Sequence, residues 1–405
     1  MIRLLALIAA AFALAAGSAE AATLHLVRVV VVTRHGVRPP TQKNDELAKY
    51  SDQAWPNWPV DAGELTPHGG ETVKLMGVTV REAYRAEGLL PRHRCAKPAA
   101  VTIWADGHDQ RTRESGRITA EALQPGCGLK AGSVDTEPRD PIFGGSDAAA
   151  CRMDQDKARA WAAANPNTQP LPPLGDSIAR LQAIFAPKAC EGGAGTCFTP
   201  ANAGSGAAMS AFPAAGGLAE DLLLEYADGK PMREVGWGRA SAADIADVMV
   251  LHERAFALLR TNTYASANRG APMARMILAA LAGKPVGGGP QSGPDLKLLT
   301  LSGHDTNLVL MAGVFGLNWT LPGEPDSTAP ATALAFELWS DGAHQFVRPV
   351  IYYETMEQLR SLTPDRAEKL PLTFADCASG PKQSCPLEQL TQRVEAVLPP
   401  GCGEF

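Results

Sequence analysis

The chain has 405 residues, of which 45 % are hydrophobic and 20 % are charged, and its formal net charge is −6. This composition is that of a globular protein with room for one large domain or two ordinary ones, and it excludes a disordered or fibrous chain. The negative charge also excludes a general nucleic-acid-binding protein, because such a protein needs a basic surface to displace counterions.

Residues 1–21 have the pattern of a secretory signal peptide. Arg3 precedes an apolar stretch from Leu4 to Ala16, and the small residues that follow offer a cleavage site at Ala19-Glu20-Ala21. The stretch is shorter than the roughly 20 residues that a membrane-spanning helix needs, and no later segment is long and apolar enough to span a bilayer. We therefore expect a periplasmic or secreted protein with no membrane partner.

Three short runs of β-branched and apolar residues each end in polar residues that can do chemistry. The runs are Leu24–Thr33, Ala100–Ala105 and Leu296–Leu301, and they lead into RHGVRPP (34–40), DGHDQRTR (106–113) and SGHDTN (302–307). Helical periodicity resumes after the second and third runs, which predicts an α/β fold with a mostly parallel central sheet and flanking helices. Because ligands bind where the carboxyl ends of parallel strands meet, these polar residues should share one pocket.

Other segments predict helices. Thr66 and Pro67 are typical of an N-cap and first helical position, and the amphipathic pattern that follows runs to about Gly88. Residues 241–261 and Pro272–Leu281 also show helical periodicity.

The segment between about 145 and 240 is rich in Ala, Gly and Pro and has few strand signals. It predicts a mainly helical insertion domain, residues 146–240, over the edge of the sheet. The α/β core would then have two parts, residues 22–145 and residues 241–405.

The eight cysteines show neither a C-x-x-C pair nor zinc-like spacing with histidine. In an oxidising compartment an even number predicts four disulfides, although spacing alone leaves about 105 pairings open. The near neighbours Cys190/Cys197 and Cys377/Cys385 could close local loops.

Several arginines in one pocket indicate a dianionic ligand. Guanidinium groups are always charged and offer paired donors that match phosphate oxygens, so Arg34, Arg38 and Arg111 are candidates for a phosphate clamp. A metal site is not expected, because these groups would repel a divalent cation and no H-E-x-x-H spacing is present. Five nearby side chains could otherwise offer metal ligands: His35, His108, His304, Asp109 and Asp305.

His35 is the candidate nucleophile. The chain has no G-x-S-x-G elbow and no P-loop, and its cysteines are expected in disulfides. A ring nitrogen of His35 can attack phosphorus if the ring is neutral, and the neighbouring arginines favour that state by lowering its pKa. Hydrolysis would then proceed by phosphorylation and dephosphorylation of His35.

The leaving alkoxide needs a proton, for which Asp305 is the candidate donor. The alternative is that Asp305 is only the N-cap of the helix that follows, a position that favours the ionised carboxylate. A bound phosphate dianion would raise the pKa of Asp305 and so favour the acid.

The motifs RHGVRPP (34–40) and GHDTN (303–307), in this order, resemble those of the histidine acid phosphatases. The chain looks most like the bacterial periplasmic phytases and glucose-1-phosphatases of that family. Four further segments have counterparts there: GELTPHGGE (63–71), DQRTRESG (109–116), GWGR (236–239) and NWTLPGEPD (318–326).

This resemblance implies a smaller α-helical domain beside the active-site cleft and no metal or other cofactor. It implies His35 as nucleophile, Asp305 as proton donor, and the following phosphate ligands: Arg34, Arg38, Arg111 and His304. It also implies the four disulfides Cys95–Cys127, Cys151–Cys402, Cys190–Cys197 and Cys377–Cys385.

Residues at the rim of the pocket match the family less closely. Lys43 comes one position later than the lysine typical of these phytases, and Asp221 stands near the place of a usual glutamate. Arg269 matches a substrate-side arginine. These three residues are predicted to bind substrate.

The predicted function is acid phosphomonoester hydrolysis by a monomer acting on a small phosphate ester, with phytate as substrate. The HDTN form of the second motif favours phytate, and the alternative is a sugar-phosphate or broad-specificity phosphatase. Two other classes remain: a phosphate-ester-binding protein, which would not need His35 and Asp305, and a phosphoglycerate-mutase-like transferase, which export disfavours.

Overall fold

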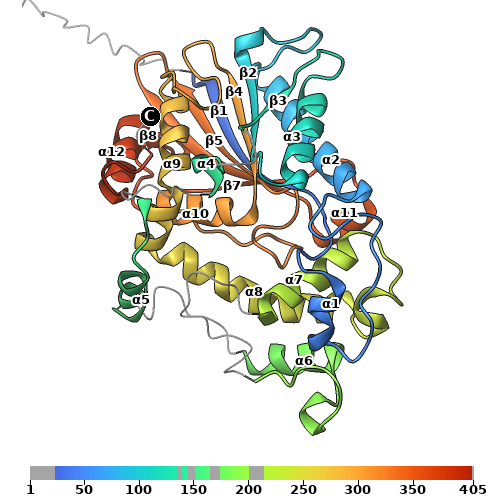
Figure 1. The fold of residues 1–405 in the computed structure, drawn as a ribbon. Helices are drawn as coiled ribbons and strands as arrows, with labels where there is room; N and C mark the ends of the chain where they lie inside the picture. The colour runs from blue at the N-terminus through green and yellow to red at the C-terminus, as the bar shows by residue number, and fades with distance from the viewer. Residues whose placement is uncertain (1–22, 135–138, 145–150, 165–173, 200–213, 404–405) are drawn as a thin grey trace, which may run out of the picture.

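A computed structural model of the chain describes residues 23–134, 139–144, 151–164, 174–199 and 214–403 (Figure 1). The predicted signal peptide, residues 1–21, lies outside the described residues. Among the described residues, no helix has the length and apolar character needed to cross a membrane.

The fold is built on one mixed sheet of eight strands, with β8 pairing to β6 beside the main path, whose order is β3-β2-β4-β1-β5-β6-β7. Strands β3, β2, β4 and β1 are mutually parallel, and the pairs from β1 to β5 onward are antiparallel. The strands are β1 (His25–Arg34), β2 (Val101–Ala105), β3 (Ala131–Gly132), β4 (Leu298–Gly303), β5 (Ala333–Ser340), β6 (Gln345–Tyr353), β7 (Glu368–Pro371) and β8 (Cys385–Pro386). The three predicted strands are β1, β2 and β4, and the predicted α/β class is confirmed.

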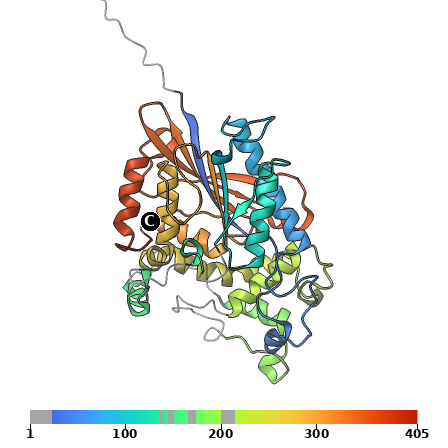
Figure 2. The ribbon, with the colours of Figure 1, turned by 45° about the horizontal axis from the view of Figure 1, so that its top comes forward.

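Helices cover both faces of the sheet and extend beyond one end of it (Figures 1 and 2). They are α1 (Asn44–Leu47), α2 (Pro67–Ala86), α3 (Gln110–Leu123), α4 (Pro141–Gly144), α5 (Gln155–Ala164), α6 (Gly175–Phe185), α7 (Ala214–Ala227), α8 (Ala242–Thr261), α9 (Thr263–Leu281), α10 (Asp305–Phe315), α11 (Met356–Ser361) and α12 (Leu387–Val397).

The valines of β1 alternate between two hydrophobic cores, because successive side chains of a strand point to opposite faces. Val30 and Val32 pack in the core formed with α9, α10 and α12, whereas Val29 and Val31 pack in the core formed with α2 and α3. Burial on both faces explains why this strand is almost continuously apolar.

A third hydrophobic core joins α1, α6, α7 and α8. In Figure 1 these helices lie below the sheet, on the side where β1 ends. Because α8 belongs to this core together with α6 and α7, the helical layer includes residues beyond position 240. The boundaries at 145 and 240 stay a prediction.

Most predicted helix starts agree with the structure. Thr66 is the N-cap of α2, and its side chain accepts a hydrogen bond from the Gly69 amide. The predicted start at Pro272 was wrong, because α9 begins at Thr263 and passes through this proline. Proline removes one helical hydrogen bond, but Asn262 caps the first turn and most of α9 is buried, so packing outweighs the local penalty.

All eight cysteines form disulfides, in the four pairs that the family resemblance implies. Cys151–Cys402 joins positions 251 residues apart and so fixes the C-terminal segment to the chain just before α5. Closing a long loop in this way removes conformational freedom from the unfolded chain.

Glu354 should make the fold less stable as pH rises. This side chain is fully buried, and neither carboxylate oxygen has a hydrogen-bond partner in the described part of the chain. Burial raises the pKa of Glu354 well above its ordinary value. The folded state holds this proton more tightly than the unfolded state does. Protonated Glu354 therefore contributes its full stabilisation below the unfolded pKa, and this contribution is lost as the pH rises through the folded pKa.

We therefore expect Glu354→Gln to raise the melting temperature by at least about 2 °C near pH 8 and to leave it unchanged near pH 4. The exposed Glu368 offers a control, Glu368→Gln, that should shift neither value. Thermal unfolding of both variants at the two pH values measures the effect, and an equal shift at both would contradict this account.

Candidate active site

Arg34, the last residue of β1, is a buried cation held by three carboxylates. Its Nη1 donates to Asp326 Oδ2 at 2.8 Å and to the Thr328 carbonyl at 2.7 Å. Its Nη2 pairs with Glu220 and lies 3.2 Å from Asp305 Oδ2. Burial disfavours the charge, but Asp305, Glu220 and Asp326 together raise the pKa of Arg34, so it stays positive.

His35 lies at the centre of the cluster in a neutral form. Nδ1 is 2.8 Å from the Gly36 carbonyl, so a proton on Nδ1 satisfies this contact and leaves the lone pair on Nε2. The pKa of His35 lies well below its usual value, first because the ring is buried and then because Arg111, Arg38 and Arg34 repel a second proton. The imidazole is therefore available as a nucleophile in acid solution.

The glycine after His35 is required by close packing. A Cβ on Gly36 would lie 2.1 Å from the Gly69 carbonyl oxygen near the start of α2. This contact brings the loop after β1 against the N-terminus of α2, and so fixes the position of His35 between the two elements.

Arg38 and Arg111 add two further guanidinium groups beside His35. Arg38 Nη2 is 3.3 Å from Glu220 Oε2, and Arg111 Nη2 is 3.1 Å from Asp109 Oδ2. In both arginines, as in Arg34, the Nε–H is buried and has no acceptor among the described residues. The three side chains therefore keep donor capacity for an anion.

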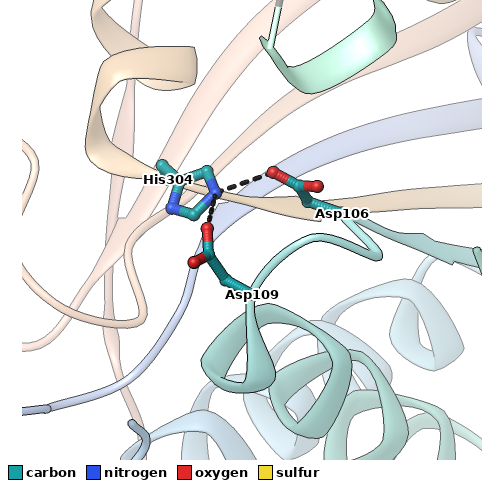
Figure 3. Close-up of side chains that lie close together, drawn as sticks. All are labelled: Asp106, Asp109 and His304. Atoms are coloured by element: carbon teal, nitrogen blue, oxygen red, sulfur yellow. Dashed lines mark hydrogen bonds and ion pairs between the residues drawn. The ribbon is translucent and has the colours of Figure 1, made fainter. Parts of the chain in front are cut away.

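His304 directly follows β4, and it lies next to two carboxylates that follow β2 (Figure 3). Its Nε2 lies 2.9 Å from Asp106 Oδ2 and 3.4 Å from Asp109 Oδ2. Asp106 is fully buried; burial opposes its charge, but hydrogen bonds from His304 and Arg139 lower its pKa. The ring of His304 meets that of His35 edge-on, with centroids 5.6 Å apart.

These three side chains have the composition of a metal site, but their atoms are already in use. Asp106 Oδ2 accepts from Arg139 Nη2 at 2.8 Å, and Asp109 pairs with Arg111. A divalent cation between them would lie against two guanidinium groups, which disfavours metal binding. The described residues hold a second such cluster, His252, Glu253 and Asp326, where Asp326 already binds Arg34.

Asp305 is the first residue of α10, and the N-cap position belongs to His304, so the N-cap alternative for Asp305 was wrong. Its Oδ1 still accepts hydrogen bonds from the Thr306 amide at 2.5 Å and the Thr306 hydroxyl at 2.9 Å. Burial would raise the pKa of Asp305, but Arg34 and Arg38 hold it below its ordinary value. Without a ligand, Asp305 is therefore a carboxylate.

The three residues predicted at the rim are not part of this cluster of contacts. Lys43 is exposed at the start of α1, and Arg269 lies in α9, where burial lowers its pKa. Asp221 is buried, but the ion pairs with Arg34 and Arg38 are made by its neighbour Glu220. Their predicted part in substrate binding stays a prediction.

Four charged residues of the site were not predicted from the sequence. Glu220 could have been found, because it lies in the otherwise apolar stretch of α7, LAEDLLLEY. Asp106 follows a strand directly, which was a usable signal. Asp326 and Arg139 lie in loops and carry no periodic signal.

The family model for the histidine phosphatase superfamily, branch 2, matches residues 25–182 and 215–352. The chain belongs to this superfamily. The predicted recognition of the family and the predicted enzyme class, a phosphomonoesterase, are thereby confirmed. His35, Arg111 and His304 all lie within the matched ranges of this histidine phosphatase.

The histidine phosphatase is also similar to individual proteins over nearly its whole length. Phytase AppA of Escherichia coli strain K12 is 33 % identical, over 94 % of this chain and 93 % of that protein. A glucose-1-phosphatase of Salmonella typhimurium is 26 % identical, over 90 % of each chain. The structure of Hafnia alvei phytase in complex with myo-inositol hexakis sulphate has a TM-score of 0.83 and 31 % identity, over 96 % of this chain and 100 % of that chain.

Proposed function

We propose that this histidine phosphatase hydrolyses phytate through a phosphohistidine intermediate on His35. The observation that carries the proposal is a neutral imidazole, with its lone pair on Nε2, among three guanidinium groups that keep unused donors. A phosphate dianion fits this arrangement because the cations compensate its charge while the ring stays nucleophilic.

In the first step, Arg34, Arg38, Arg111 and His304 bind the non-bridging oxygens of the substrate phosphate. The Nε2 lone pair of His35 attacks phosphorus, the P–O ester bond breaks, and Asp305 gives its proton to the leaving alcohol oxygen. In the second step, water attacks phosphorus of the phosphohistidine and the ionised Asp305 takes a proton from that water. The P–Nε2 bond breaks, its electron pair returns to His35 Nε2, and inorganic phosphate leaves.

Asp305 gains its proton only with substrate. Arg34 and Arg38 hold its pKa low in the unliganded protein, and a dianion bound to the same arginines reduces this effect. Substrate therefore brings the negative charge that converts Asp305 into an acid, which suits mildly acidic conditions.

Phytate is preferred over a sugar phosphate as substrate for two reasons. Proteins named phytases reach 33 % and 31 % identity with this chain, whereas the glucose-1-phosphatase reaches 26 %. The exposed Lys43 can also meet a ligand that carries several phosphates. We further propose that the protein acts as a monomer. We also propose that it acts in the periplasm or outside the cell, and its four disulfides support an oxidising compartment of this kind.

Phosphate release from phytate and from glucose 1-phosphate, measured at about pH 5, tests the substrate. We expect kcat/KM to be at least about tenfold higher for phytate, and Lys43→Gln to narrow the difference mainly through KM. Lys49→Gln, another lysine of the same segment, serves as the matched control. Equal rates for both substrates would instead indicate a general phosphatase.

A further inference from the structure

Arg139 is a fourth guanidinium at the site, and the mechanism above does not use it. Its Nη2 lies 2.8 Å from Asp106 Oδ2, 3.8 Å from Asp109 Oδ2 and 3.2 Å from His304 Nε2. It comes from the segment before α4 and not from a strand end. Its side chain is 39 % exposed, whereas that of Asp106 is fully buried.

The neighbouring residues hold this segment in place. Asp140 accepts hydrogen bonds from Trp104 Nε1 in β2 at 2.7 Å and from the Ile142 amide at 2.9 Å. Phe143 accepts from the Asn307 side chain in α10, and Asn307 also accepts from the His304 amide. The segment that carries Arg139 is thus hydrogen-bonded to β2 and to the start of α10, which follows β4, next to the phosphate site.

Space for the side chain is provided at Gly144. A Cβ at this position would lie 2.5 Å from Arg139 Cδ. The stem of Arg139 therefore lies across the end of α4, and this placement directs the guanidinium toward Asp106.

The carboxylates of Asp106 and Asp109 both face Nε2 of His304, and each carboxylate is paired with a different guanidinium. Arg111 lies 3.1 Å from Asp109, and Arg139 lies 2.8 Å from Asp106. Without Arg139, the buried charge of Asp106 would be met, among the described residues, only by His304 and by the neutral His108 amide, beside the position where a phosphate dianion is expected. An uncompensated buried carboxylate there would repel the dianion.

We propose that Arg139 is a positioning residue for phosphate binding: it neutralises Asp106, so that Asp106 can orient His304 without repelling the substrate phosphate. This inference rests on the proposed function, in which His304 is a phosphate ligand. It adds a residue that acts through Asp106 and His304 and that does not itself touch the reacting atoms.

The proposal is tested by steady-state hydrolysis of p-nitrophenyl phosphate and by its inhibition with inorganic phosphate. We expect Arg139→Gln to raise KM and the inhibition constant of phosphate about tenfold, while kcat changes less than about threefold. Arg139→Lys keeps the positive charge and should retain most of the phosphate affinity. Arg117→Gln, at an exposed arginine of α3, is the control and should change neither constant.

A double variant separates charge compensation from other roles. If Arg139 acts by neutralising Asp106, then Asp106→Asn combined with Arg139→Gln should restore phosphate inhibition to within about threefold of the unaltered protein. Failure of this rescue, or an Arg139→Lys variant as weak as Arg139→Gln, would overturn the proposal. Loss of folding in Arg139→Gln, seen in its circular dichroism, would overturn it as well, by showing a structural role.

Calorimetric titration with inorganic phosphate separates this proposal from the proposed function. If the unaltered protein binds phosphate but does not turn over p-nitrophenyl phosphate, the proposed function fails, and the effect of Arg139→Gln on binding still decides the role of Arg139.

Discussion

His35→Ala is expected to lower kcat by at least about 10³-fold, because no other described side chain of the cluster places a nucleophilic nitrogen where Nε2 of His35 lies. The same change should abolish the phosphoenzyme. Rapid acid-free quenching of turnover with ³²P-labelled substrate, followed by gel electrophoresis, would measure the label that stays on the protein. We expect label on the unaltered protein and none on His35→Ala.

The control for this experiment is His93→Ala, at an exposed histidine outside the cluster, which should retain both label and turnover. Circular dichroism would verify that His35→Ala is folded. Label that survives in the folded His35→Ala variant would assign the nucleophile to another residue. The arginines would remain as a phosphate site in that case, because their ion pairs with Glu220, Asp326 and Asp109 do not involve His35.

The position of His35 was predictable because strand ends are a strong signal. Strand β1 is buried on both faces and ends at Arg34. Strand β4 is also buried along its length and ends just before His304. Parallel pairing of these strands then brings the two motifs together, with Arg34 opposite Gly303. Local sequence and the rule for parallel sheets were sufficient for this part of the site.

The antiparallel half of the sheet was not predicted, although one signal was present. Asp341 and Gly342 separate two runs rich in apolar residues, a typical hairpin pattern, and the structure has β5 and β6 there. The start of α9 could not be found in the same way, because tertiary packing decides that a helix continues through Pro272.

Which carboxylates pair with the arginines could not be predicted, because most of them come from distant parts of the chain and meet the arginines only in the folded structure. Glu220 comes from α7, far along the chain from Arg34, and its neighbour Asp221 was equally acidic. The rotation of α7 about its own axis, set by its packing against α8, decides which of the two meets the cluster. Arg139 is a similar case, since its place depends on Asp140 and Gly144 and not on a motif.

Asp305→Asn is expected to slow hydrolysis of substrates with poor leaving groups by about 10²–10³-fold. An alkoxide such as that of phytate or glycerol phosphate is a strong base and needs a proton as the P–O bond breaks. The nitrophenolate of p-nitrophenyl phosphate is a stable anion and needs no such help, so its rate of release should fall much less. Asparagine cannot donate an acidic proton, but its oxygen can still accept from the Thr306 amide, which keeps the start of α10 intact.

The measurement is kcat/KM for a series of phosphate esters whose leaving groups differ in pKa, with and without the substitution, because kcat/KM reports the steps up to release of the leaving group and excludes the later attack of water, in which Asp305 also takes part. In the Asp305→Asn variant, log(kcat/KM) should depend steeply on the leaving-group pKa, whereas the unaltered protein should show a shallow dependence. Thr306→Val provides a control, since it removes a hydroxyl that bonds Asp305 but leaves the carboxyl in place. An equal loss for all esters would mean that Asp305 acts only through its charge on Arg34, because losing that ion pair would affect every substrate alike.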